Sequence, residues 1–254
     1  MDFDISQLLE QWEYKPGHVV VRKIKGKNGK EKLQLRVDLG ILQMNVEGRP
    51  DGKKPLGYPS LFEYQQAQLH RHVGENQGSD AGFKLKPEDC SKLQLEAIQY
   101  HHRYICLLQL EDYAGVIRDT ERNLSVFEFV RKHASEEMAW SLQQFQPQLM
   151  MILTRARGFL ALETKDYEQA VASIEDGLEQ IRNFYKETSC AENAEQSAEV
   201  MSLEHWLAEV RERKPLSPRE RLEQALAEAV RSEDYERAAK VRDELRNLKP
   251  SEQQ

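Results

Sequence analysis

The last forty residues of this 254-residue chain constrain its fold most, because they predict two short helices with too little apolar surface for a core of their own. In the first predicted helix, Leu222, Leu226 and Ala229 recur at helical spacing and therefore lie on one face. In the second, the residues on one face are Ala238, Arg242, Leu245 and Leu248. Two helices of roughly four turns each do not make a stable core in isolation. Their apolar faces must therefore contact the rest of this chain, a second copy or another protein.

Local start and stop signals delimit the two helices. Ser217 supplies an N-cap hydroxyl, Pro218 occupies the first helical position, and Glu220 closes a capping box. Asp234 caps the second helix, and Pro250 ends it. These signals predict a helical hairpin with a short connection.

The hairpin also carries a specific residue pattern, formed by Leu222, Leu226, Ala229-Val230, Glu233-Asp234-Tyr235-Glu236, Ala238-Ala239, Val241-Arg242-Asp243, Leu245 and Leu248. This pattern resembles the UVR motif, which occurs in the B and C subunits of the bacterial excinuclease, in some Clp-type ATPases and in activators of protein-arginine kinases. The resemblance covers about one eighth of the chain. In that family the motif is an antiparallel hairpin that docks onto a like hairpin or another partner, and it contains no catalytic residue.

The resemblance implies a partner-binding role for Leu222, Leu226, Ala229, Tyr235, Ala238, Ala239, Arg242 and Leu245. Adjacent alanines agree with this role, because small side chains allow two helices to approach closely. We expect the leucines to supply buried area and the pair Arg242-Asp243 to set the register of the contact. The alternative is that the hairpin packs internally as a further layer of this chain's own helices.

Composition limits the class of protein. Hydrophobic residues make up 39% of the sequence and charged residues 31%, and no window approaches twenty consecutive apolar residues, so we expect a soluble protein without a transmembrane helix. The first residues are acidic and do not resemble a signal peptide. Three widely spaced cysteines (Cys90, Cys106 and Cys190) indicate reduced thiols, and together these features predict a cytoplasmic protein, bacterial by the resemblance.

The first part of the chain has strand character. The segment 18–25 is rich in β-branched residues, and the segment 33–39 alternates with a period of two. Between them lies Asn28-Gly29, a favoured hairpin turn. The apolar positions change from odd to even after Gly40, which predicts a bulge or a tight corner there. We therefore expect a small antiparallel β-meander, followed by a short helix that begins at Ser60.

The middle of the chain is helical and contains a repeated corner. The corner ends in Asp112-Tyr113 in its first copy and in Asp166-Tyr167 in its second, and each predicts a turn between antiparallel helices. The second copy resembles a tetratricopeptide unit, with Gly158, Tyr167 and Ala170 at its small and aromatic positions. The copies lie 54 residues apart, however, whereas tetratricopeptide units repeat every 34, so a regular array is not expected. The terminal hairpin repeats the corner at Tyr235.

The resulting prediction is an α+β, mainly α, protein. Its expected parts are a β-meander domain with a short helix over 1–73, a flexible linker over 74–86, an antiparallel helical domain over 87–213 and a UVR-like hairpin over 214–250.

A search of the sequence for chemistry finds no catalytic constellation, no metal site and no cofactor motif. The adjacent His101 and His102 diverge by about 100° on a helix, and His70 and His72 do not share a helical face. The sequence has no His-Glu-x-x-His and no paired Cys-x-x-Cys. We therefore expect no enzymatic activity.

A run of basic residues surrounds the first predicted turn: Arg22, Lys23, Lys25, Lys27, Lys30 and Lys32. A two-stranded basic ribbon is able to follow a phosphate backbone, and Trp12, Tyr14 and Tyr58 are candidates for stacking on bases. A basic edge also protects a sheet from aggregation, and the net charge of −7 disfavours general nucleic-acid binding.

The leading hypothesis is a non-enzymatic adaptor that docks through the UVR-like hairpin. By resemblance, its partner is an excinuclease subunit in nucleotide excision repair or a Clp-type component in protein quality control, and self-association is the other option. The helical middle is expected to offer a second, peptide-accepting surface. The alternative is a DNA-binding protein that uses the basic ribbon, with the hairpin as its dimerisation element.

Overall fold

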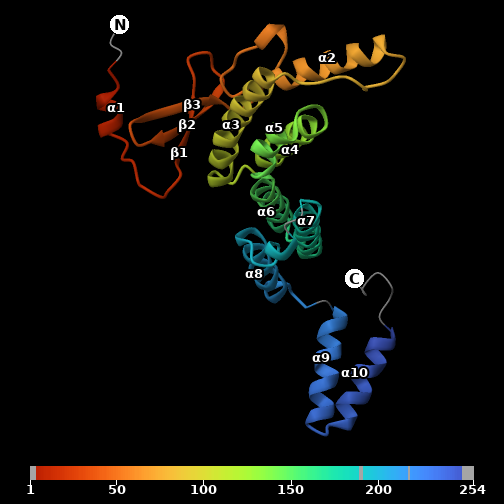
Figure 1. Cartoon of the computed structure of the whole chain (residues 1–254). Helices are drawn as coiled ribbons and strands as arrows, with labels where there is room; N and C mark the ends of the chain where they lie inside the picture. The colour runs from red at the N-terminus through yellow and green to blue at the C-terminus, as the bar shows by residue number, and fades with distance from the viewer. Residues whose placement is uncertain (1–3, 189–190, 217, 248–254) are drawn as a thin grey trace. The chain divides into compact units, whose positions relative to one another are not determined.

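The computed structural model describes residues 4–188, 191–216 and 218–247. The expectations for Cys190, Ser217, Leu248 and Pro250 lie outside these residues. Contacts between Cα atoms divide the chain into two compact units, 1–207 and 208–254, and the division falls inside helix α8 (Ala198–Arg213) (Figure 1). The domain limits expected from the sequence stay a prediction.

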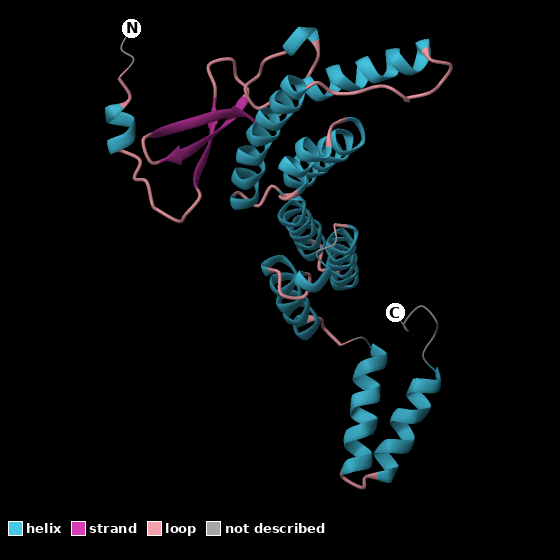
Figure 2. Cartoon of the chain, viewed as in Figure 1, coloured by secondary structure: helices cyan, strands magenta, loops and turns pink. Residues whose placement is uncertain are grey.

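The predicted β-meander is confirmed as a three-stranded antiparallel sheet (Figure 2). Its strands, in the order β1-β2-β3, are β1 (Val20–Lys25), β2 (Glu31–Val37) and β3 (Gly40–Asn45). Leu33 pairs with Met44 and Leu35 with Leu42, so odd positions of β2 and even positions of β3 share the core face. A two-residue turn before Gly40 therefore explains the change of phase.

The turn between β1 and β2 differs in detail from the expected one. Only Gly29 of the Asn-Gly pair has a positive φ, at 75°. The side chain of Asn28 instead accepts a hydrogen bond of 3.2 Å from the backbone N–H of Lys30. The loop therefore closes around one left-handed glycine and one side-chain cap.

A helix begins after Ser60, as predicted. This helix is α2 (Leu61–Glu75), and the Ser60 side chain accepts a hydrogen bond from the backbone N–H of Glu63. The short helices α1 (Ser6–Glu10) and η1 (Pro55–Gly57) precede it. After α2 the backbone N–H of Leu85 donates a 2.7 Å hydrogen bond to the carbonyl of His133, and Leu85 is buried. This contact fastens the expected linker segment to the helices.

The helical middle consists of two long hairpins and connecting helices. They are α3 (Pro87–Gln109), α4 (Tyr113–His133), α5 (Glu136–Gln143), α6 (Gln146–Glu163), α7 (Tyr167–Glu187), η2 (Ala191–Asn193) and α8. Pro147 lies in the first turn of α6 and marks the break from α5. The apolar side of α8 is buried, at Val200, Leu203, Trp206, Leu207 and Val210.

The repeated corner has one geometry in all three places where the sequence predicts it. The residue before the aspartate is left-handed, with φ of 60° at Glu111, 60° at Lys165 and 57° at Glu233. The backbone N–H group of the aspartate then donates a hydrogen bond to the carbonyl of the residue five positions earlier. These bonds are Asp112→Leu107 (2.9 Å), Asp166→Ala161 (3.0 Å) and Asp234→Ala229 (2.8 Å). This Schellman-type ending turns the chain, and the aspartate caps the following helix.

Glycines allow the helices of the second hairpin to pack closely with their neighbours. A Cβ atom at Gly158 would lie 2.5 Å from the Trp206 ring, and one at Gly177 would lie 2.0 Å from the Thr154 hydroxyl. Gly158 therefore has the close-packing role expected of the small position in the tetratricopeptide-like unit.

A buried ion pair connects the sheet to the helices. The guanidinium of Arg103 on α3 donates two hydrogen bonds, of 2.6 and 2.7 Å, to the carboxylate of Asp119 on α4. It also donates to the carbonyl of Asn45, the last residue of β3, and to that of Gly48, shortly after the strand. Beside it, the buried carboxylate of Glu96 accepts the first backbone N–H group of α2 at 2.8 Å. The end of the sheet and the start of α2 are thus fastened to α3 and α4.

Replacing Asp119 with alanine should lower the free energy of unfolding by about 3–5 kcal/mol, because it leaves the guanidinium of Arg103 buried without its carboxylate. Urea unfolding followed by circular dichroism measures the loss. Glu128→Ala is the control, since its pair with Arg131 is about half exposed and should contribute about 0.2–1 kcal/mol. Equal losses in the two variants would contradict this role of the buried pair.

Candidate functional site

Besides the end of α8, the unit 208–254 contains a two-helix hairpin built on very small side chains (Figure 1). Its helices are α9 (Pro218–Arg231) and α10 (Tyr235–Asn247). Between them Ala229, Ala238 and Val241 are buried, with exposed fractions of 0%, 9% and 8%. The alanines let the two helices approach closely, but they bury little apolar area.

The eight predicted partner-binding residues occupy three environments. Ala229 and Ala238 are buried inside the hairpin. Leu222, Leu226 and Leu245 are half-buried along its edge, and Tyr235, Ala239 and Arg242 are exposed. The structure therefore assigns the two alanines to holding the hairpin together and leaves the other six accessible at least in part.

Several accessible residues lie on one face of the hairpin. Successive residues of an α-helix are rotated by 100° about its axis. Viewed down α9, Leu226 and Val230 therefore lie on the same side of the buried residue Ala229. Viewed down α10 in the same way, Tyr235, Ala239 and Arg242 lie on one side of the buried residue Ala238. Because the helices are antiparallel, these two sides form a single face. We call this face, made of Leu226, Val230, Tyr235, Ala239 and Arg242, the docking face.

The opposite face of the hairpin is charged and carries Arg221, Glu228, Arg237 and Glu244, all of them exposed. On the docking face, Val230 is exposed by 53% and Tyr235 by 70%, and by the same helical spacing the charged residues Arg219, Glu223 and Arg246 lie on this side as well. Val230 was missing from the predicted binding residues, although its spacing of four from Leu226 was available in the sequence. The two faces therefore differ in one respect, which is that the docking face carries the large exposed apolar side chains Val230 and Tyr235.

Ion pairs on this hairpin lie at its exposed surface. Arg219 pairs with Glu223 at 2.8 Å and Lys240 with Glu236 at 2.9 Å, both at i,i+4 spacing. On the docking face, Arg242 lies 3.8 Å from Asp243, and both side chains are more than half exposed. Such a pair contributes little to stability, so a partner's carboxylate is able to replace it.

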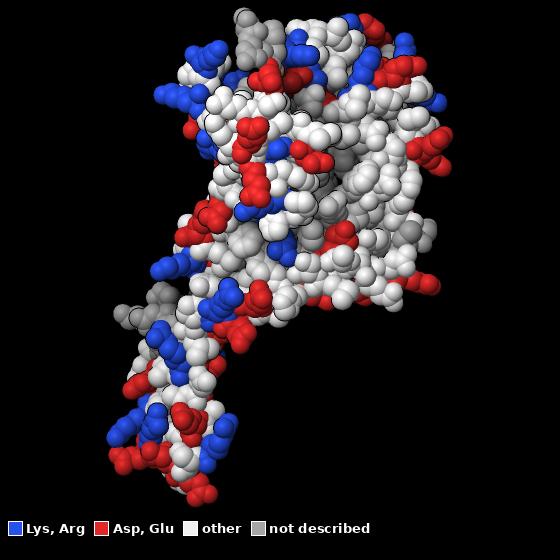
Figure 3. All heavy atoms as spheres, turned by 90° about the vertical axis from the view of Figure 1, so that its left-hand side faces the viewer, with Lys and Arg blue, Asp and Glu red and all other residues white. Residues whose placement is uncertain are grey.

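The predicted basic ribbon is divided by the pleat of the sheet. Lys23 and Lys25 point to the core side, Arg22 and Lys32 to the other, and Lys27 and Lys30 lie in the turn. Lys23 lies 3.8 Å from Glu31 and 3.9 Å from Asp112. On the face drawn in Figure 3, Lys and Arg are interspersed with Asp and Glu. DNA binding by these residues stays a prediction.

The aromatic residues suggested for stacking on bases have partners within the chain. The guanidinium of Arg22 lies 4.1 Å above the ring of Trp12, and that of Arg36 lies 6.0 Å from Tyr14. Tyr58 forms an edge-to-face contact with Tyr64 at 5.4 Å. Each of these contacts supports the local fold.

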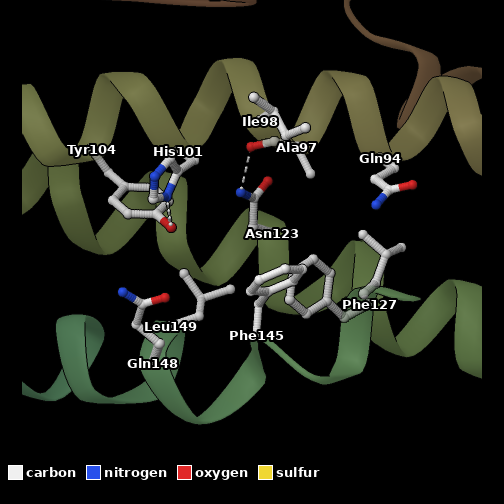
Figure 4. A pocket seen from close by; sticks show the side chains of 11 residues that line it. Gln94, Ala97, Ile98, His101, Tyr104, Asn123, Phe127, Phe145, Gln148 and Leu149 are labelled. Atoms are coloured by element: carbon white, nitrogen blue, oxygen red, sulfur yellow. Dashed lines mark hydrogen bonds between the residues drawn. The ribbon is translucent and has the colours of Figure 1, made fainter. Parts of the chain in front are cut away.

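A hollow of about 350 Å³ lies among α3, α4, α5 and the start of α6 (Figure 4). It is lined by Gln94, Ala97, Ile98, His101, Tyr104, Asn123, Phe127, Leu142, Phe145, Gln148 and Leu149. Nothing in the sequence predicted this hollow, although Gln94, Ala97, Ile98 and His101 follow helical spacing on α3. Only the packing of four helices brings these residues together.

The wall of the hollow carries no charged side chain, because none of its lining residues is Asp, Glu, Lys or Arg. The Nδ1 atom of His101 lies 2.7 Å from the Tyr104 hydroxyl. Burial, and after it the positive charge of His102, lowers the pKa of His101. Its imidazole is therefore neutral at pH 7. Asn123 donates to the carbonyl of Ala97 at 2.9 Å.

In the part of the chain that the structure describes, no group of three or more His, Cys, Asp or Glu residues is placed to hold a metal ion. None of its helices combines the length and apolar character needed to span a membrane.

Comparison with known families identifies the hairpin. Residues 219–249 match the UVR family, described as the UvrB/uvrC motif. The match covers α9 and α10 and confirms the resemblance seen in the sequence. No curated protein and no solved structure gives a significant match to the chain.

Replacing Asp234 with alanine should destabilise α10 by about 1 kcal/mol, because the Asp234 carboxylate accepts a 3.0 Å hydrogen bond from the backbone N–H of Arg237. Amide hydrogen exchange resolved by mass spectrometry should show about fivefold faster exchange in α10. Asp243→Ala is the control, since Asp243 is exposed and caps no helix. Unchanged exchange in Asp234→Ala would contradict the capping role.

Proposed function

We propose that this chain is a non-enzymatic protein-interaction protein that binds a helical partner through the docking face of α9 and α10. The UVR motif supports this proposal, because in its family the motif is a docking hairpin. The physical support is that an alanine-based hairpin buries little area and leaves the side chains of Val230 and Tyr235 exposed. Leu222 and Leu245, half-buried at the edge, would complete the contact.

The proposal rests mainly on a comparison of Tyr113 and Tyr235, which have the same position in the repeated corner but differ in their contacts and in their exposure to solvent. In the first hairpin, Tyr113 stacks on Phe159 of α6 at 5.3 Å between ring centroids, and Phe159 in turn contacts Trp206 at 4.7 Å. The corner tyrosine there holds one helical hairpin against the next. Tyr235 has the same place in the third corner and is 70% exposed.

We infer that the partner places a helix with an aromatic or large apolar side chain against Tyr235. An aromatic pair contributes about 0.5–1.5 kcal/mol beyond its buried area. Covering Val230, which is 53% exposed, adds on the order of 1 kcal/mol. A carboxylate on the partner would pair with Arg242 and fix the register.

On the basis of the motif, we also propose that the interaction takes place in the bacterial cytoplasm. The partner would be an excinuclease subunit in DNA repair or a Clp-type component in the stress response, and a second copy of this chain is the remaining option. The identity of the bound protein chooses among them.

The double substitution Val230→Asp and Tyr235→Asp should abolish partner binding, because it places two carboxylates on the docking face. These side chains are exposed, so the hairpin should stay folded, whereas Leu226 is half-buried and a change there would also disturb α9 and α10. The measurement is affinity capture from host lysate, with a chain that ends at Lys214 as the reference for complete loss.

The matched control is Glu228→Ala with Arg237→Ala on the charged face. It should capture the same proteins as the unchanged chain. Capture that survives the docking-face substitutions, or that is lost only in the control, would refute the proposal. Circular dichroism must show equal helix content in both variants.

A further inference from the structure

The hollow among α3, α4, α5 and α6 has a closed, apolar floor. Ala97, Tyr104, Phe127, Leu142 and Leu149 form it, and each is buried, with exposed fractions of 2–6%. The hollow opens to solvent, and its volume of about 350 Å³ lies within the range of small-molecule sites.

The mouth of the hollow keeps large apolar side chains in contact with solvent. Ile98 is 43% exposed and Phe145 is 50% exposed. In Figure 4, Phe127 and Phe145 lie on the side of the hollow opposite to Ala97 and Ile98 of α3. A flat apolar ligand would fit between these two walls and would remove the exposed rings from water.

Polar groups stand at the rim. The Nδ1 atom of His101 is taken up by the Tyr104 hydroxyl, which leaves Nε2 for a ligand. No side-chain hydrogen bond joins Gln94 or Gln148 to another residue that the structure describes. Two amides and one neutral imidazole at the edge of an apolar space are suited to one or two hydrogen bonds with a ligand.

The wall also restricts the charge of the ligand. Charged residues make up 31% of the sequence, yet none lines this hollow. An ionised group moved into it would lose its hydration without gaining a counter-charge, which is costly. The ligand that fits is therefore uncharged.

We propose that this hollow is a binding site for a small, uncharged, largely aromatic or aliphatic molecule that hydrogen-bonds at its rim to Gln94, His101 or Gln148. The site lies in the unit 1–207 and does not depend on the proposed docking function. A concave, four-sided space favours a small molecule over a polypeptide segment, which would also need the exposed surface beyond the mouth.

The test uses the intact chain and the neutral fluorophore N-phenyl-1-naphthylamine. Its emission should rise and saturate at one molecule per chain. Ile98→Glu places a charge at the mouth and should weaken binding at least tenfold. The 8-sulfonate of the same fluorophore should also bind at least tenfold more weakly than the neutral form.

The matched control is Leu95→Glu. Leu95 lies on the same helix and is 64% exposed, but it does not line the hollow. This variant should bind the fluorophore within twofold of the unchanged chain. Absence of saturable binding, equal losses for Leu95→Glu and Ile98→Glu, or equal affinity for the sulfonate would each overturn the proposal.

Discussion

The structure depends on one local constraint, the way in which its long helices end. Each of three helices stops at a left-handed residue, and the aspartate that follows caps the next helix at once, at Asp112, Asp166 and Asp234. The chain therefore reverses within three residues and produces antiparallel hairpins. A hairpin of this kind has an apolar side that something else must cover.

The hairpins meet this requirement differently. The first two cover one another, and the ring contacts of Phe159 with Tyr113 and with Trp206 connect them to α8. The buried ion pair of Arg103 and Asp119 connects the sheet to the helices of this unit, because Arg103 also donates hydrogen bonds to backbone carbonyls at the end of β3. The third hairpin lies in the unit 208–254 and has a narrow core of alanine and valine, with Val230 and Tyr235 of its docking face exposed. This difference leads from the fold to the proposed docking function.

Local signals in the sequence predicted the three corners, the meander and the start of α2, because each depends on residues that are close in the chain. The residues of the docking face were only partly predicted, since the predicted partner-binding residues included Tyr235 but not Val230, although the motif contains both. The pairing of Arg103 with Asp119 and the hollow beside Ala97 were not predicted. Both arise where helices meet, and single-sequence periodicity does not specify which helices meet.

Hydrogen exchange of the intact chain, alone and with its captured partner, tests the docking function most directly. The account predicts that the partner slows exchange within 222–245 and leaves the helices of the unit 1–207 unchanged. Slower exchange confined to the basic ribbon or to the helical middle, with α9 and α10 unaffected, would contradict the account.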